Sequence, residues 1–245
     1  LAWNGYETDA RFPELYFQAC VVIDPAGTQV LRYRRLISMY APSPYDVLDP
    51  YLDAYGEDAL FPVADTAVGR LAAIASEEIL YPEIARLHAV KGAEVFVHSS
   101  SEVSSPQATP KTIAKQARAV ENLAYVVSAN TGGMTGTPIP QSSADRGSKI
   151  VDPRGVILAE AAAGPSMCAF AEVDIALARR MRRKTAMGNL LARQPMALYA
   201  REYAKADIHP EDSLMQDGAV QTPAKSFYRD RQTQVIEALA KRGVI

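Results

Sequence analysis

The chain has 245 residues, of which 48% are apolar and 22% charged, and its formal net charge is −2. This globular composition excludes a disulfide scaffold and a membrane span, because there are only two cysteines and no run of about 18 apolar residues. With three histidines and a near-neutral charge, we expect no metal, no cofactor and no nucleic-acid or membrane partner. Cys20 and Cys168 lie far apart, which suits a reducing, cytoplasmic compartment.

The first quarter of the chain alternates between strand patterns and loops. Residues 16–23 and 28–34 predict two strands of a hairpin, joined by the turn Asp24-Pro25-Ala26-Gly27. Residues 38–62 are rich in Pro, Asp and Tyr and predict a long ordered loop with one short helix.

From residue 70 the pattern changes to strands that alternate with helices. The predicted strands are 70–76, 94–98 and 124–129, and the predicted helices are 82–91 and 109–123. Gly92 ends the first helix, and Thr109 caps the second with Pro110 at its first position. A strand–helix–strand unit of this kind predicts parallel pairing of its two strands.

The last third of the chain predicts a hairpin, one more strand and two helices. These elements are the hairpin strands 148–151 and 156–160, the strand 168–173, and the helices 175–183 and 226–242. The preceding residues 130–145 are rich in Gly, Pro, Ser and Thr and predict a loop that forms a wall of a substrate pocket. We expect a single domain over residues 1–245 with a C-terminal tail from about residue 195.

Ser76 is the sharpest candidate for a reactive group. It ends a buried strand, is followed by Glu77 and Glu78, and precedes a helix that begins near Pro82. Such a junction exposes a side chain at the carboxyl edge of a sheet, beside backbone N–H groups that can stabilise an oxyanion. From spacing alone, a serine that only caps a turn is the alternative.

The residues around Ser76 resemble the nucleophile segment of the nitrilase (carbon–nitrogen hydrolase) superfamily. The segment reads Gly69-Arg-Leu-Ala-Ala-Ile-Ala-Ser76-Glu-Glu78-Ile-Leu-Tyr81-Pro82-Glu83-Ile-Ala-Arg86. Residues 109–130 and 147–155 resemble further parts of the family, so that the resemblance covers about residues 14–194. It implies a mixed α/β fold, the nitrilase-like four-layer αββα sandwich, acting on a small amide or nitrile as a homodimer or larger homo-oligomer.

The family uses a Glu-Lys-Cys triad, and this sequence departs from the triad at each member. Ser76 stands where the cysteine belongs, and Arg35 stands where the lysine belongs. The catalytic glutamate would lie in the family's N-terminal portion, which has no counterpart before Leu1, so we expect the chain to lack that portion. Asp46 and Asp49 are the candidates for an auxiliary acidic residue.

These departures leave three interpretations of Ser76 open: an engineered replacement, a natural nucleophile, or the remnant of a lost one. The first function we expect is hydrolysis of a non-peptide C–N bond. Ser76 would be the nucleophile, Arg35 the anion stabiliser, and the backbone N–H after Ser76 part of the oxyanion hole. The alternative is a catalytically impaired protein of the same fold that binds a small molecule or a partner.

His98 is a candidate base for Ser76. It ends the strand predicted to lie beside that of Ser76, and Glu102 or Asp145 could orient it as in a serine hydrolase. A histidine that only satisfies loop backbone groups is the alternative. Glu77 and Asn130 are further candidates for catalysis or for the pocket.

Residues 179–184, Arg-Arg-Met-Arg-Arg-Lys, form a dense basic cluster. Such clusters bind phosphate or nucleic acid in some proteins. Because the rest of the chain has no basic excess, we expect a solvated helix face or an oligomer contact instead.

Overall fold

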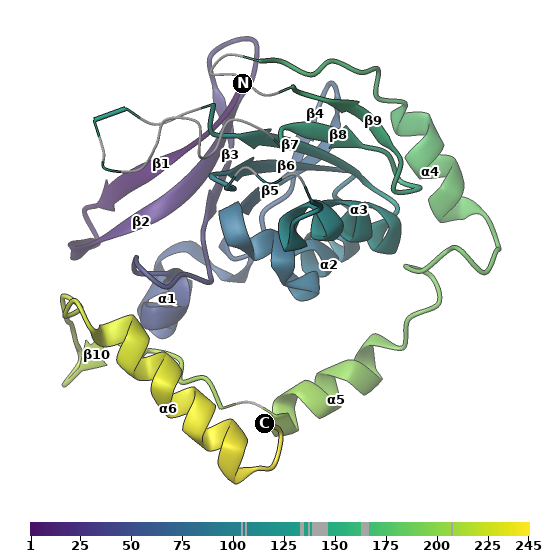
Figure 1. Ribbon diagram of the computed structural model, residues 1–245. Coiled ribbons are helices and arrows are strands. Elements are labelled where there is room, and N and C mark those ends of the chain that lie inside the picture. Colours follow the sequence, from purple (N-terminus) through teal and green to yellow (C-terminus); the bar gives the residue numbers. More distant parts are fainter. Residues whose placement is uncertain are drawn as a thin grey trace. The chain divides into compact units, whose positions relative to one another are not determined.

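The computed structural model describes residues 1–103, 105, 107–132, 135–136, 138, 147–162, 167–206 and 208–245 (Figure 1). The chain forms two compact units. Unit 1 comprises residues 1–4, 19–33 and 61–193, and unit 2 comprises residues 5–18, 34–60 and 194–245. The single domain expected from the sequence stays a prediction.

Unit 1 is built on a six-stranded sheet with the order β4-β5-β6-β7-β8-β9. Its strands are β4 Ala64–Thr66, β5 Gly69–Ala75, β6 Val95–Ser100, β7 Tyr125–Asn130, β8 Lys149–Val151 and β9 Ile157–Glu160. Strands β5, β6 and β7 are parallel, which confirms the pairing expected of the strand–helix–strand unit. Their carboxyl ends at Ala75, Ser100 and Asn130 therefore lie at one edge of the sheet, where ligand sites of α/β proteins gather.

Helices α2, Pro82–Val90, and α3, Pro110–Asn122, pack side by side against this sheet (Figure 1). Both begin with a proline, which fits the first helical position because its missing N–H has no partner there. The Thr109 hydroxyl caps α3 by accepting from the Thr112 N–H at 3.1 Å, as the sequence predicted. The first turn of α3 is thereby fixed.

Helix α4, Ile175–Arg183, carries the basic cluster, and two of its arginines bind the rest of unit 1. Arg179 pairs with both carboxylate oxygens of Glu94, at 2.5 and 2.9 Å. Arg182 donates to the carbonyl groups of Ala93, Asn122 and Leu123. These arginines hold α4 in place, so the cluster is more than the solvated face that we expected.

The prediction of a strand over residues 168–173 is wrong. These residues are described, and they form no strand. Their alternating pattern meets no partner strand, and Phe170 is 86% exposed. A strand without a neighbour leaves its backbone groups unpaired, which is why an alternating pattern alone does not make one.

A second sheet has three strands in the order β1-β2-β3, and its residues belong to both units. They are β1 Ala2–Asp9, which the sequence analysis missed, β2 Phe12–Ile23 and β3 Gln29–Arg34. The predicted turn between β2 and β3 forms because Asp24 Oδ1 accepts from the N–H groups of Ala26 and Thr28, each at 2.9 Å. Gly27 completes the turn with φ 83°, a conformation that glycine adopts without strain.

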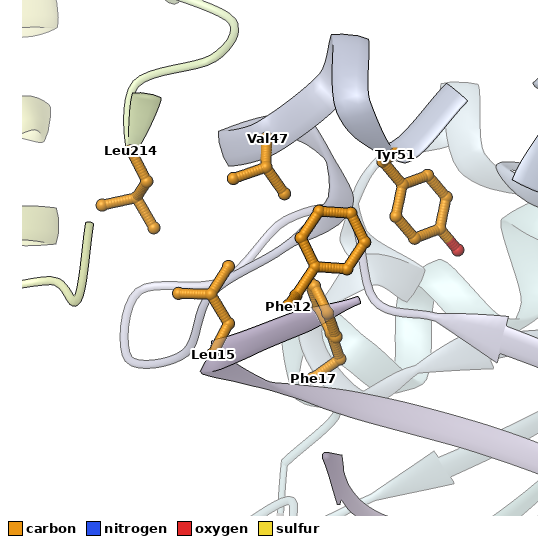
Figure 2. Close-up of a cluster of buried hydrophobic side chains, with 6 residues drawn as sticks. All are labelled: Phe12, Leu15, Phe17, Val47, Tyr51 and Leu214. Atoms are coloured by element: carbon orange, nitrogen blue, oxygen red, sulfur yellow. The ribbon is translucent and has the colours of Figure 1, made fainter. Parts of the chain in front are cut away.

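Unit 2 has a core of six buried side chains, shown in Figure 2. They are Phe12, Leu15, Phe17, Val47, Tyr51 and Leu214. The remaining elements of the unit are the 3₁₀ helices Pro44–Val47 and Glu57–Ala59, α1 Leu48–Tyr55, α5 Met196–Ala206, β10 Met215–Gln216, β11 Ala219–Val220 and α6 Phe227–Lys241. Helices α1 and α6 confirm predictions, whereas α5 was missed. None of the helices in the described residues is long and apolar enough to cross a membrane.

Asp46 organises unit 2 and is fully engaged there. One carboxylate oxygen accepts from the backbone and hydroxyl of Ser43, each at 2.9 Å. The other accepts from the Ser213 hydroxyl at 3.0 Å and pairs with Arg231. Because these contacts join the 38–62 segment to the C-terminal tail, they indicate a structural rather than an auxiliary catalytic role for Asp46.

We expect Phe17→Ala to lower the free energy of unfolding by about 3–5 kcal/mol, because it leaves a cavity among Phe12, Tyr51 and the Arg34 guanidinium. Chemical denaturation followed by circular dichroism measures the loss. Phe170→Ala, at an exposed phenylalanine, is the matched control and should change stability by less than about 0.5 kcal/mol. Equal effects of the two variants would contradict the assignment of this core.

Candidate active site

Ser76 lies at the carboxyl end of β5, as predicted, and begins the short 3₁₀ helix Ser76–Leu80. Its φ of 49° is in the left-handed region that residues with a side chain rarely adopt. Two hydrogen bonds hold this turn: Ala75 N–H donates to Glu78 Oε2 at 3.2 Å, and His98 Nε2 bonds the Ser76 carbonyl at 2.8 Å. Backbone strain held in this way is found at functional sites.

The Ser76 hydroxyl contacts Lys111, a residue that the sequence analysis missed. Lys111 Nζ lies 3.5 Å from Ser76 Oγ and 3.2 Å from Ser100 Oγ. Lys111 is the second residue of α3, the helix that follows β6. Its position directly after Pro110 could have revealed it, because the helix after a parallel strand begins near the edge where the strands end.

His98 serves the backbone rather than the Ser76 hydroxyl. Its Nε2 must carry the ring proton, since the Ser76 carbonyl can only accept, and its Nδ1 accepts from the Ser128 hydroxyl at 2.8 Å. Burial lowers the pKa of His98 to about 3, so the ring is neutral at physiological pH. Among the described residues the serine-hydrolase arrangement is therefore not formed, and Asp145 lies outside them.

Glu102 and Asn130 fasten the loop between β6 and α3 to the end of β7. The Glu102 N–H donates to Asn130 Oδ1 at 2.6 Å, and Asn130 Nδ2 donates to the Glu102 carbonyl at 2.9 Å. The Glu102 carboxylate accepts from Thr109 and, at 2.8 Å, from Lys115. Asn130 N–H donates in turn to Ser148 Oγ at 2.9 Å. This network sets the position of the first turn of α3.

Lys115 is fully buried, and its partner Glu102 is nearly so. Burial lowers the pKa of Lys115, whereas the Glu102 carboxylate opposes that shift. Lys115 Nζ also donates to the Gly147 carbonyl at 3.1 Å. The charges of Lys149 and Lys111 also lower the pKa of Lys115, so both lysines lie close enough to repel it.

Glu77 and Glu78 follow Ser76 in the same 3₁₀ helix. Glu77 is half-buried, whereas Glu78 is completely buried and accepts from the Tyr33 hydroxyl at 2.8 Å. The described residues contain no group of three or more His, Cys, Asp or Glu that could hold a metal ion.

Arg35 belongs to unit 2, so its predicted partnership with Ser76 stays a prediction. Its Nε donates to the Ile37 carbonyl and one terminal nitrogen to Gln18 Oε1, each at 2.6 Å. The guanidinium is thus engaged by neighbours within its own unit.

The protein-family model of the carbon-nitrogen hydrolases matches residues 4–183, which is most of the chain. The chain belongs to the carbon–nitrogen hydrolase family. This confirms the resemblance seen around Ser76.

Curated relatives of this carbon–nitrogen hydrolase family member include two kinds of protein. The nitrilase and fragile histidine triad fusion protein NitFhit of Caenorhabditis elegans is 27% identical over 177 residues, covering 71% of this chain and 38% of that protein. A formamidase of Bacillus cereus (strain B4264) is 31% identical over 121 residues, covering 49% of this chain and 33% of that protein. The chain thus spans about a third of the length of these relatives.

Solved structures of the family show the same fold. The carbon-nitrogen hydrolase from Helicobacter pylori G27 aligns with a TM-score of 0.62 and 22% identity, over 83% of this chain and 70% of that chain. The NitN amidase from Nesterenkonia sp. AN1 aligns with a TM-score of 0.59 and 20% identity, over 82% of this chain and 69% of that chain. The mixed α/β nitrilase fold expected from the sequence is confirmed.

We expect Lys115→Met to lower the free energy of unfolding by about 3–5 kcal/mol, because it leaves the Glu102 carboxylate buried without its cation. Chemical denaturation measures the loss. The exposed pair Lys205–Glu202 gives the matched control, and Lys205→Met should cost less than about 1 kcal/mol. Adding Glu102→Gln to Lys115→Met should recover part of the loss, and a loss as small as the control's would contradict the buried pair.

The low pKa of His98 predicts a loss of stability in acid. The pKa of about 3 in the folded protein lies below the ordinary value of 6.5. Between these two values the unfolded chain binds a proton that the folded chain does not, so the free energy of unfolding decreases as the pH is lowered. The effect is about 1.4 kcal/mol per pH unit below 6.5. When the pH is lowered from 7 to 5, the free energy of unfolding of His98→Gln should therefore decrease by about 2 kcal/mol less than that of the natural chain.

Unfolding by urea at both pH values measures this difference. His209→Gln, at an exposed histidine, is the control and should follow the natural chain. An unchanged pH dependence in His98→Gln would show that His98 titrates normally in the folded protein.

Proposed function

We propose that this member of the carbon–nitrogen hydrolase family hydrolyses a small amide through Ser76. The observation that carries the proposal is the strained Ser76 at the carboxyl end of β5, in a segment that matches the family. The names of two relatives, a formamidase and an amidase, support an amide as substrate.

The chemistry begins with attack of Ser76 Oγ on the carbonyl carbon. The backbone N–H that follows Ser76 donates to the developing oxyanion. Loss of ammonia or an amine leaves an acyl ester on Ser76, and water then hydrolyses the ester. Arg35 as an anion stabiliser, Glu77 as a pocket residue, a homodimer or larger homo-oligomer, and a cytoplasmic location remain part of this proposal.

Two structural features are consistent with a serine as the nucleophile at position 76. The half-buried Ser76 side chain is accessible, and its hydroxyl contacts a lysine amine. A hydroxyl needs such a neighbour more than a thiol does, because it is not ionised near neutral pH.

The test is release of ammonia from formamide and acetamide by the purified chain. Ser76→Ala should lower kcat/KM by at least about 1000-fold, because it removes the nucleophile. Thr185→Ala, which removes an exposed hydroxyl outside the site, is the control and should leave turnover unchanged.

Equal turnover in Ser76→Ala and the natural chain would remove Ser76 from the mechanism. Amide binding without turnover, unaltered by Ser76→Cys, would favour the alternative of an impaired hydrolase that binds a small molecule. The two departures from the family triad, at Ser76 and Arg35, are what make this alternative worth testing.

A further inference from the structure

A serine that attacks an amide must pass its proton to a base. Three titratable side chains at this end of the sheet, those of His98, Glu78 and Glu102, already have other partners. His98 Nε2 donates to the Ser76 carbonyl, so that nitrogen is not available to accept. Glu78 Oε2 accepts from both Tyr33 and the Ala75 N–H, and the two oxygens of Glu102 accept from Thr109 and Lys115.

Lys111 is the titratable side chain that contacts the Ser76 hydroxyl, with Nζ 3.5 Å from Oγ. We propose that the neutral amine of Lys111 is the catalytic base that takes the Ser76 proton. The proposal rests on the proposed role of Ser76 as nucleophile and adds a residue that the family triad does not contain.

The surroundings position the Lys111 amine for this task. The Thr109 hydroxyl binds both the Glu102 carboxylate and the Thr112 N–H, and this fixes the turn that carries Lys111. Ser100 Oγ, 3.2 Å from Nζ, holds the end of the side chain. The buried Lys115 lies one turn further along the same helix face as the half-buried Lys111.

Nearby cations favour the neutral form of the Lys111 amine, which a base requires. The ammonium of Lys115 pairs with Glu102, and that of Lys149 lies 3.1 Å from Glu160. Lys111 Nζ contacts the hydroxyl groups of Ser76 and Ser100, and the charges of Lys111 and Lys115 oppose each other. A lysine near other cations and partly withdrawn from water reaches its neutral form more readily.

The reaction then balances. The Ser76 O–H bond breaks, its proton goes to Lys111 Nζ, and Oγ bonds the amide carbon. Collapse of the tetrahedral intermediate breaks the C–N bond, and the leaving nitrogen takes the proton from the Lys111 ammonium. In the second half, Lys111 accepts a proton from the attacking water and returns it to Ser76 Oγ as the acid leaves.

The experiment measures the reactivity of Ser76 directly, with an alkyl fluorophosphonate as probe. Ser76 Oγ bonds phosphorus, fluoride leaves, and the proton goes to Lys111. Mass spectrometry of the Ser76 peptide gives the rate of labelling. Lys111→Met and Lys111→Arg should each slow this rate by at least about 100-fold, because neither side chain can accept the proton at neutral pH.

Lys184→Met, at an exposed lysine, is the matched control and should label at the natural rate. The natural chain provides a second measurement that needs no variant. Its labelling rate should rise with pH above 7 as Lys111 loses its proton. His98 cannot cause that rise, because its pKa of about 3 keeps it neutral throughout, and the rise should vanish in Lys111→Met.

The outcomes separate this inference from the proposed function. Labelling of Ser76 that depends on Lys111, without amide turnover, supports the base and overturns the proposed hydrolysis. Amide turnover that is lost in Ser76→Ala but retained in both Lys111 variants overturns the base alone. Natural labelling in Lys111→Arg would show that the cation, not proton transfer, matters, and absence of labelling at Ser76 in the natural chain would also refute the base.

Discussion

The buried ion pair between Lys115 and Glu102 is the constraint on which the candidate site depends. A lysine ammonium inside a protein is tolerated only when a carboxylate and further acceptors surround it, and here Glu102 and the Gly147 carbonyl do so. Glu102 can meet this demand only if the loop after β6 folds back on α3. The Asn130 side chain closes that loop on β7. The pair thus brings the first turn of α3 to the edge where β5 and β6 end.

The same edge explains the strain at Ser76. A left-handed serine persists only where its neighbours hold it, and His98 and Glu78 supply those contacts from β6 and the 3₁₀ helix. Burial keeps the His98 ring neutral, so Nε2 donates to the Ser76 carbonyl while Nδ1 accepts from the Ser128 hydroxyl. A histidine used to support the backbone is lost as a base. If Ser76 is the nucleophile, as proposed, a residue other than His98 accepts its proton.

The sequence predicted the elements around the site better than the contacts within it. Periodicity and caps located β5, β6, β7, α2 and α3, since burial and end signals are local properties. The strand expected at 168–173 failed because strands need neighbours, which a local pattern cannot supply. His98 and Ser76 were expected to be in contact, and they are. The sequence pattern could not show that His98 bonds the Ser76 carbonyl rather than its hydroxyl. Lys111 was missed because no local pattern shows its contact with Ser76, although its place at the start of the helix after a parallel strand was a signal.

The proposed roles of Arg35 and Lys111 illustrate how replacing one member of the family triad would affect more than one position. A cysteine thiol near neutral pH is already partly ionised, so a fixed cation beside it is useful in itself. A serine hydroxyl is not ionised, and a guanidinium such as Arg35 cannot take its proton. In the proposed function Arg35 stabilises the anion, and the proton goes to another group. The amine of Lys111, which contacts the hydroxyl from a turn fixed by Thr109 and Glu102, is the group that we propose takes this proton.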